Sequence, residues 1–310
     1  MSKIAFMFPG QGAQNVGMGK ELYDNFGPAK AVFDEADAIL GRKISQLCFE
    51  GPEEALKDTR NAQPAIFTTS VAAWKVIEEA GIVPNFVAGH SLGEYSALVA
   101  SGAIAFAEGL KLIQRRAHLM AGADPDQTGT MAAVLGLDRE KLLPILVEAS
   151  KVATVEAANF NCPGQIVISG LKEGIAKAQT LVGEAGGKFI PLAVSGPFHS
   201  SLMRPAAEAF RDDLNAVRWQ EPTIPLIANV SARPVADKEM ADSLYQQIFS
   251  SVLWEDSIGF LRSQDVTIFL ELGPGKVLNG LVKKTLKDVT LLNCEDFGSF
   301  KKALAILKEV

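Results

Sequence analysis

The chain has 310 residues, of which 48% are hydrophobic and 21% are charged, and its formal net charge is −6. This composition is typical of a globular protein with enough apolar material for one large domain or two smaller ones. The acidic balance argues against nucleic acid or an anionic membrane as a partner, because Lys and Arg do not outnumber Asp and Glu.

The first predicted element is an apolar strand over residues 4–8, which ends in the turn Pro9-Gly10-Gln11-Gly12. This turn is neither a dinucleotide fingerprint nor a phosphate loop, because the required glycine spacing and the Gly-Lys-Ser/Thr sequence are missing. Turns at the carboxyl ends of strands are where α/β sheets bind ligands. Gln11 therefore either presents a backbone N–H to a substrate or belongs to a plain loop.

The segment up to residue 80 reads as helices with short breaks, at 21–26, 29–40, 44–49, 52–57 and 63–80. A short apolar strand over 86–88 then leads into Gly89-His90-Ser91-Leu92-Gly93, and a helix is expected over 94–101. Gly-x-Ser-x-Gly between a strand and a helix is the pattern of a nucleophile elbow, in which the serine Oγ is exposed. Free N–H groups at the helix start can receive an oxyanion. Ser91 is the candidate nucleophile, and a glycine-rich βα turn is the alternative.

A second helix is expected over 106–121, and one charged residue lies on its apolar side. Arg116 falls in the middle of the arc formed by Leu112, Ile113 and Met120, whereas Arg115 points to solvent. A guanidinium that faces the interior needs a carboxylate partner. That partner is either a carboxylate of the protein or the carboxylate of a substrate, which a guanidinium binds as a bidentate fork.

The pattern changes near residue 124, after a polar linker. Strands are expected over 130–135, 153–159, 165–170 and 188–194, with helices over 138–150 and 172–185. The order β-α-β-β-α-β is that of a ferredoxin-like unit. We therefore expect an α/β fold: a large α/β-hydrolase-like domain (1–123 and 195–310) with a mostly parallel sheet, and an inserted ferredoxin-like subdomain (124–194). A cleft between them is a natural substrate site.

The chain contains three histidines, and they differ in their suitability as a general base. His118 lies on the polar face of its helix, and His90 is inside the tight elbow, where adjacent side chains diverge. By elimination His199, in a loop before a helix expected over 202–216, is the best base for Ser91. Strands over 224–230, 267–271 and 289–293 and helices over 240–249, 254–261 and 277–286 complete the chain.

The three cysteines are widely spaced and lack a C-x-x-C motif. This spacing favours a reducing cytoplasm with structural thiols, and it argues against a disulfide framework or a zinc site. Cys162 beside Pro163-Gly164 is a minor alternative as a catalytic cysteine. No apolar run reaches the length of about 18 residues that a membrane-spanning helix needs.

Six ordered motifs together resemble malonyl-CoA:acyl carrier protein transacylases and the acyltransferase domains of polyketide synthases. The resemblance covers essentially the whole chain, and its motifs are Gly10–Gln14, Gly89–Glu94, Arg116, Asn159 with Gln165, Phe198-His199 and Glu271–Gly275. It implies ping-pong malonyl transfer from malonyl-CoA to the phosphopantetheine thiol of acyl carrier protein. It also implies a cytoplasmic monomer that needs no metal or other cofactor.

The resemblance also implies a role for each site residue. Ser91 is the nucleophile, His199 is the base, and the N–H groups of Gln11 and Leu92 form the oxyanion hole. Arg116 binds the malonyl carboxylate. Phe198, before the histidine, favours malonyl over methylmalonyl. A backbone carbonyl, expected near residues 251–254, orients the histidine.

Three alternatives to malonyl transfer in fatty acid synthesis remain at this point. One is a stand-alone polyketide acyltransferase. The second is a serine esterase or thioesterase, which shares Gly-x-Ser-x-Gly but predicts an Asp or Glu between serine and histidine at a strand end and gives Arg116 no role. The third is a non-enzymatic scaffold that binds the carrier.

Overall fold

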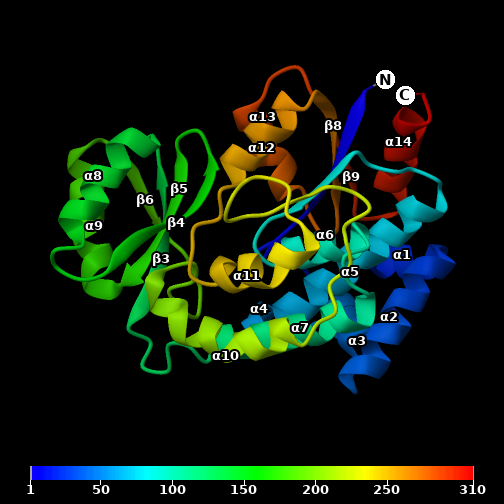
Figure 1. The fold of residues 1–310 in the computed structure, drawn as a ribbon, viewed down its shortest axis with the longest axis horizontal. Coiled ribbons are helices and arrows are strands. Elements are labelled where there is room, and N and C mark those ends of the chain that lie inside the picture. The colour runs from blue at the N-terminus through cyan, green and yellow to red at the C-terminus, as the bar shows by residue number, and fades with distance from the viewer. Residues whose placement is uncertain (1, 310) are drawn as a thin grey trace.

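Five parallel strands form the central sheet of the computed structural model, which describes residues 2–309 (Figure 1). Their spatial order is β7-β2-β1-β8-β9. The strands are β1 (Lys3–Phe8), β2 (Phe86–Gly89), β7 (Leu226–Ile227), β8 (Val266–Leu272) and β9 (Thr290–Cys294). Parallel sheets are buried on both faces, which explains why β1 and β8 read as nearly continuous apolar runs.

Alternate side chains of β1 enter two different cores. Ala5 and Met7 pack with α12 (Trp254–Ser263) and α13 (Val277–Thr285), whereas Phe6 and Phe8 face the larger core. The helices that contribute to the larger core are α1 (Lys20–Asn25), α2 (Gly27–Leu40), α3 (Ile44–Glu50), α4 (Glu53–Lys57), α5 (Thr59–Glu79), α6 (Gly93–Ala100), α7 (Phe106–Ala121), α10 (Arg204–Asn215), α11 (Asp237–Gln247) and α14 (Phe297–Leu307).

A second, antiparallel sheet has the order β4-β5-β3-β6. Its strands are β3 (Gly129–Leu135), β4 (Val155–Cys162), β5 (Gln165–Leu171) and β6 (Lys188–Pro191), and the helices α8 (Arg139–Ala149) and α9 (Lys172–Glu184) cover one face. These elements form the lobe on the left of Figure 1. The mixed α/β fold with a parallel sheet and a separate ferredoxin-like unit is therefore as predicted.

Main-chain hydrogen bonds join β4 of the second sheet to the segment of the large domain before α12. Phe160 N–H donates to the carbonyl of Val252 (2.9 Å), and Val252 N–H donates to the carbonyl of Ala158 (2.8 Å). Buried residues of the second sheet, including Met131 and Val167, belong to the larger core. The division into 1–123 with 195–310 and 124–194 as separate domains stays a prediction.

Several element boundaries differ from those predicted. Helix α5 begins at Thr59 rather than 63, because the side chain of Asp58 accepts the N–H of Arg60 and caps the helix. Strand β7 has only two residues instead of seven, because the chain turns back at Ala228, whose N–H donates to the carbonyl of Arg233. Helix α14 was not predicted, although Asp296 and Ser299 form a capping box at its start.

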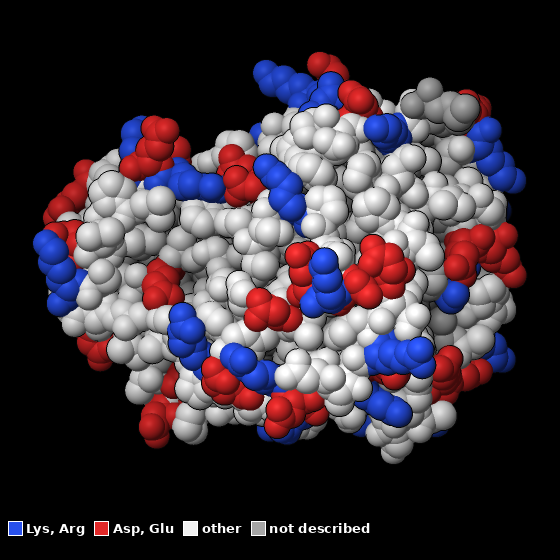
Figure 2. Space-filling view, in the orientation of Figure 1, with Lys and Arg blue, Asp and Glu red and all other residues white. Residues whose placement is uncertain are grey.

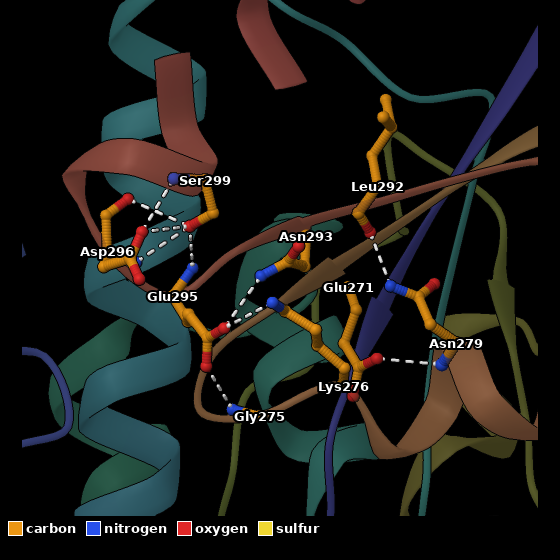
Figure 3. Close-up of polar contacts among 9 residues, drawn as sticks. All are labelled: Glu271, Gly275, Lys276, Asn279, Leu292, Asn293, Glu295, Asp296 and Ser299. Atoms are coloured by element: carbon orange, nitrogen blue, oxygen red, sulfur yellow. Dashed lines mark hydrogen bonds and ion pairs between the residues drawn. The ribbon is translucent and has the colours of Figure 1, made fainter. Parts of the chain in front are cut away.

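The loop after β8, residues 273–275, lies outside the lining of the cavity that contains Ser91. Figure 3 shows instead a polar cluster that ties this loop to β9 and α14. The buried carboxylate of Glu271 accepts the N–H groups of Leu278 and Asn279 at the start of α13. Glu295 accepts the N–H of Gly275 and pairs with Lys276 at 3.2 Å. The Glu271–Gly275 motif thus has a structural role.

Two further properties concern the described residues as a whole. None of their helices combines the length and hydropathy that a membrane span requires. Figure 2 shows acidic and basic side chains interspersed over the visible face, without a large area of one sign. This mixed surface is as expected from a modest net charge, and it offers no broad basic surface on that face.

Candidate active site

The tight turn at Ser91 is possible only because two flanking residues are glycines. A Cβ on Gly89 would lie 1.9 Å from the backbone carbon of Gly93, and a Cβ on Gly93 would lie 2.0 Å from the carbonyl oxygen of Phe8. Ser91 itself has a φ of 50°, an uncommon conformation for a residue with a side chain. The predicted elbow is therefore present between β2 and α6.

Ser91 and His199 are brought together from positions 108 residues apart in the chain. Ser91 Oγ lies 2.7 Å from His199 Nε2, which is hydrogen-bond distance. On the other side of the ring, Nδ1 lies 2.9 Å from the carbonyl oxygen of Gln247, at the end of α11. This carbonyl fixes the tautomer: Nδ1 carries the hydrogen, and Nε2 is free to accept the serine proton.

The orienting carbonyl corrects the expectation that it would come from residues 251–254. The carbonyl of Gln247 reaches Nδ1 because α11 ends at this residue, whereas Val252 pairs with β4. The backbone of Ser250 also lies close enough to His199 to affect its pKa. No carboxylate of the described residues lies on Nδ1, so the arrangement lacks the acid of a Ser-His-Asp triad.

His199 is neutral at physiological pH. Burial and the positive charge of Arg116 lower its pKa to about 3, while the hydrogen bond to Gln247 acts weakly in the opposite direction. A neutral imidazole is the form that accepts a proton. His90 is a poor base for Ser91, as expected, because its Nε2 lies 2.9 Å from the side-chain oxygen of Asn161.

Two backbone N–H groups, one from the turn after β1 and one from the elbow, have no acceptor among the described residues. The N–H of His90 donates to the carbonyl of Phe8, and the N–H of Ser91 donates to Asn229 Oδ1. Those of Gln11 and Leu92 have no acceptor within residues 2–309, and both residues line the cavity in front of Ser91. Two convergent donors of this kind are what an oxyanion hole requires.

Arg116 is almost completely buried, with 1% of its side chain exposed. Its Nη1 donates to Gln63 Oε1 at 2.7 Å, and its Nη2 donates to both Ser91 Oγ and Gln247 Oε1 at 3.0 Å. Within residues 2–309 no carboxylate comes within 4.0 Å of the guanidinium. The structural ion pair that the sequence left open is therefore absent, and the cation faces the nucleophile.

Four polar residues of the site were not singled out in the sequence. Gln63 and Gln247 hold Arg116, Asn229 holds the backbone of the elbow, and Glu94 accepts hydrogen bonds from Gln247 and Asn229. Their signal in the sequence is weak: Gln63, Glu94 and Gln247 are polar residues in helices, and Asn229 lies in a turn after β7. The same reasoning that identified Arg116 also applies to Gln63, which lies on the buried side of α5.

All six predicted site residues line a single cavity of about 210 Å³. These are Gln11, Ser91, Leu92, Arg116, Phe198 and His199. The opposite wall comes from the second sheet and the segment after it, through Met131, Asn159 and Leu192. The other candidates lie apart: Arg115 pairs with Asp213 at the surface, and Cys162 is a buried thiol in β4. Residues 2–309 hold no cluster of three or more metal-ligating acidic, His or Cys side chains.

Comparison with known proteins identifies this arrangement. The acyl transferase domain family matches residues 5–305. The malonyl CoA-acyl carrier protein transacylase of Bacillus subtilis (strain 168) is 48% identical, over 100% of this chain and 98% of its own. The chain belongs to this transacylase family. It is an acyltransferase.

Solved structures of the family share the whole fold. The enzyme from Clostridium perfringens superposes with a TM-score of 0.96 at 42% identity, over 99% of this chain and 98% of that one. A malonyl-transacylase in complex with a type II polyketide acyl-carrier protein has a TM-score of 0.96 at 38% identity, over 98% and 100%. The likeness extends over both sheets, and therefore over both walls of the cavity.

Proposed function

We propose that the protein transfers a malonyl group from malonyl-CoA to the phosphopantetheine thiol of an acyl carrier protein in fatty acid biosynthesis, through a malonyl ester on Ser91. The observation that carries the proposal is a buried Arg116 whose Nη2 lies 3.0 Å from Ser91 Oγ, with no carboxylate of the described residues as its partner. A carboxylated acyl group on Ser91 supplies the missing anion.

In the first half-reaction Ser91 Oγ attacks the thioester carbon while His199 Nε2 takes the hydroxyl proton. The negative charge that develops on the carbonyl oxygen is stabilised by the N–H groups of Gln11 and Leu92. The tetrahedral intermediate expels the thiolate of coenzyme A, which receives the proton from His199. The product is the malonyl ester of Ser91, whose carboxylate binds Arg116.

In the second half-reaction the carrier's thiol attacks the ester carbon, and His199 again takes and returns one proton. The ester bond breaks, Ser91 recovers its hydrogen, and the thioester of the carrier forms. His199 supplies both proton transfers and the backbone supplies the charge stabilisation, so the proposed chemistry uses no metal or other cofactor. Phe198, buried at the cavity wall, is proposed to restrict the acyl group to malonyl.

All site residues come from one chain, which supports a monomer as the active form, and three buried free thiols support a reducing, cytoplasmic location. A stand-alone polyketide acyltransferase has the same chemistry, so transfer should be compared on carriers from fatty acid and polyketide synthesis. The thioesterase alternative is disfavoured, because a carbonyl rather than a carboxylate orients His199.

The decisive experiment is mass spectrometry of the protein after incubation with malonyl-CoA. A mass gain of one malonyl group on the peptide containing Ser91, which is lost when carrier protein is added, is expected. Ser91→Ala should form no ester. Rapid hydrolysis of malonyl-CoA without any transfer to the carrier would reject the proposal in favour of a thioesterase.

Arg116→Ala should lower malonyl transfer far more than acetyl transfer, because only malonyl carries a second carboxylate. Loss of one partner from a buried charge pair costs roughly 2–5 kcal/mol. The kcat/KM for malonyl-CoA should therefore fall by roughly 30-fold to 5,000-fold. Equal losses with malonyl-CoA and acetyl-CoA would show that Arg116 has only a structural role.

A further inference from the structure

Arg116 has a buried counter-charge, but this charge does not touch it. Glu94, at the start of α6, is 1% exposed, and its negative charge acts on the guanidinium. The direct partners of Arg116 are instead the neutral side-chain oxygens of Gln63, Gln247 and Ser91. Buried charges normally pair directly, so an indirect arrangement requires an explanation.

The side chain of Gln247 lies between the two charges. Its Oε1 accepts from Arg116 Nη2 at 3.0 Å, and its Nε2 donates to Glu94 Oε2 at 2.8 Å. Burial raises the pKa of Glu94 to about 7, so its carboxylate is ionised above this pH. The guanidinium of Arg116 only donates and the ionised carboxylate only accepts, so these two neighbours allow a single orientation of the amide. In that orientation Nε2 also donates to the carbonyl of Ser91 at 2.9 Å.

Glu94 is tied to the elbow by a second route. Its Oε2 also accepts the N–H of Asn229 at 3.1 Å, and the side chain of Asn229 binds both Ser91 N–H and the carbonyl of Gly89 at 2.7 Å. One carboxylate oxygen therefore connects the residues that hold the nucleophile with the residue that holds the arginine. Nucleophile and arginine keep a fixed relative position as a consequence.

A direct ion pair between Arg116 and a protein carboxylate would occupy the donors that a substrate carboxylate needs. The amide of Gln247 stands between Glu94 and Arg116, so Glu94 does not compete with a substrate carboxylate for these donors. The same amide still holds Arg116 in the orientation that Glu94 imposes on Gln247. This inference rests on the proposed function. We propose that Glu94 is a positioning residue that makes the enzyme selective for carboxylated acyl groups. It fixes the side chain of Gln247, which keeps Arg116 oriented but without a direct anionic partner.

The test is Glu94→Gln, assayed with malonyl-CoA and acetyl-CoA at pH 8. Glutamine has the shape of glutamate but is neutral, so the charge-assisted hydrogen bonds that Gln247 and Asn229 donate to Glu94 become weaker and hold Gln247 less firmly. The ratio of kcat/KM for malonyl-CoA to that for acetyl-CoA should fall about tenfold or more relative to wild type, a change of about 1.4 kcal/mol in discrimination. An unchanged ratio in a folded variant, or equal losses with both substrates, overturns the inference.

Glu271→Gln is the matched control. Glu271 is also a fully buried carboxylate that accepts two hydrogen bonds, but it caps α13 and has no contact with the cavity (Figure 3). This variant loses a buried charge as Glu94→Gln does, and its malonyl-to-acetyl ratio should equal that of wild type. A ratio lowered as far as in Glu94→Gln would show that loss of any buried carboxylate suffices, which overturns the inference.

A double-mutant comparison separates this inference from the proposed function. If Glu94 acts through Arg116, then adding Glu94→Gln to Arg116→Ala leaves the malonyl-to-acetyl ratio of Arg116→Ala unchanged. A further drop overturns the inference. Wild-type enzyme that shows no preference for malonyl-CoA would instead contradict the proposed function.

Discussion

His199 is a base whose protonation is set by its surroundings rather than by an acidic partner. The carbonyl of Gln247 orients the ring but carries no full negative charge. It therefore does not offset the lowering of the pKa of His199 by burial and by Arg116. The imidazole is therefore held neutral. This state suits the first step, because Ser91 can be deprotonated only by an unprotonated Nε2.

The chemical shifts of His199 test its protonation state. Since its pKa is lowered to about 3, the ring signals should remain those of a neutral imidazole when the pH is reduced from 8 to 5. NMR of the ring carbon and nitrogen atoms, with the signal assigned from a His199→Gln variant, measures this directly. A titration midpoint between pH 6 and 7 would contradict the prediction.

At the scale of single residues, local patterns predicted the nucleophile and the arginine but not their supports. Ser91 lies in a motif with steric requirements, and Arg116 breaks an apolar pattern, so each leaves a mark in the sequence. The carbonyl of Gln247 has no such mark, because every residue carries one. Which carbonyl reaches His199 depends on where α11 ends in space, which is decided by tertiary packing.

The elbow element depends on the absence of a side chain at Gly93. Gly93→Ala should destabilise the protein by about 3 kcal/mol or more and abolish ester formation, because the new Cβ would lie 2.0 Å from the carbonyl oxygen of Phe8. Urea unfolding and the mass-spectrometric assay measure the two effects.

Gly280→Ala is the control for this substitution. Gly280 lies inside α13, where a Cβ meets no atom within 4 Å. Replacement of a helical glycine by alanine should stabilise the protein by up to about 1 kcal/mol and leave activity unchanged. If the Gly93→Ala variant were as stable as wild type, the steric explanation of the elbow would be wrong.

The start of α13 should make the stability of the protein depend on pH. Burial raises the pKa of Glu271 to about 7, against the model-peptide value of 4.5, so between these values the folded state binds more protons than the unfolded state. The contribution of Glu271 to stability is therefore present at low pH and is lost as the pH rises towards 7. The loss amounts to roughly 3 kcal/mol.

Glu271→Gln isolates this effect, because glutamine does not titrate. Urea unfolding at pH 5 and pH 8 should show wild type losing stability relative to the variant as the pH increases. If the difference in unfolding free energy between wild type and variant is the same at pH 5 and pH 8, then Glu271 has the same pKa in the folded and unfolded states.

Among the elements, those with strong periodicity or distinct ends were predicted, and short ones were not. Helix α7 was predicted with its observed bounds, because its apolar stripe is regular. The two-residue strand β7 could not be delimited, because an edge strand needs only the two residues that pair with Val87 and Ala88. Helix α14 was omitted although Asp296 and Ser299 mark its start.

At the scale of the molecule, the active site exists only because distant segments are brought together. Ser91 is 108 residues from His199 and 156 residues from Gln247, and no local pattern contains these pairings. The order of the strands places the carboxyl ends of β1 and β2, and with them Gln11 and Ser91, side by side. His199 comes from the loop before α10 and Gln247 from the end of α11, so tertiary packing brings them to Ser91. The family resemblance could predict the grouping, whereas composition and periodicity could not.

The two sheets should unfold together in one transition. Residues of the second sheet, such as Met131, Ala158 and Val167, are buried in the core of the first, and main-chain hydrogen bonds join β4 to the segment around Val252. Ile168→Val provides the test, because Ile168 is fully buried against the helices of the second sheet only. The substitution should cost about 0.5–1.5 kcal/mol.

Trp74, Trp219 and Trp254 all lie outside residues 124–194. Trp74 and Trp219 pack in the larger core, and Trp254 packs in the smaller core that also contains Cys162 of the second sheet. Tryptophan fluorescence therefore reports chiefly on the part that contains the parallel sheet. If the molecule is one cooperative unit, Ile168→Val shifts the urea midpoint of fluorescence as far as the midpoint of far-UV circular dichroism. A shift in circular dichroism alone would show that the second sheet unfolds independently. The cavity would then lose one wall before the nucleophile and its base separate.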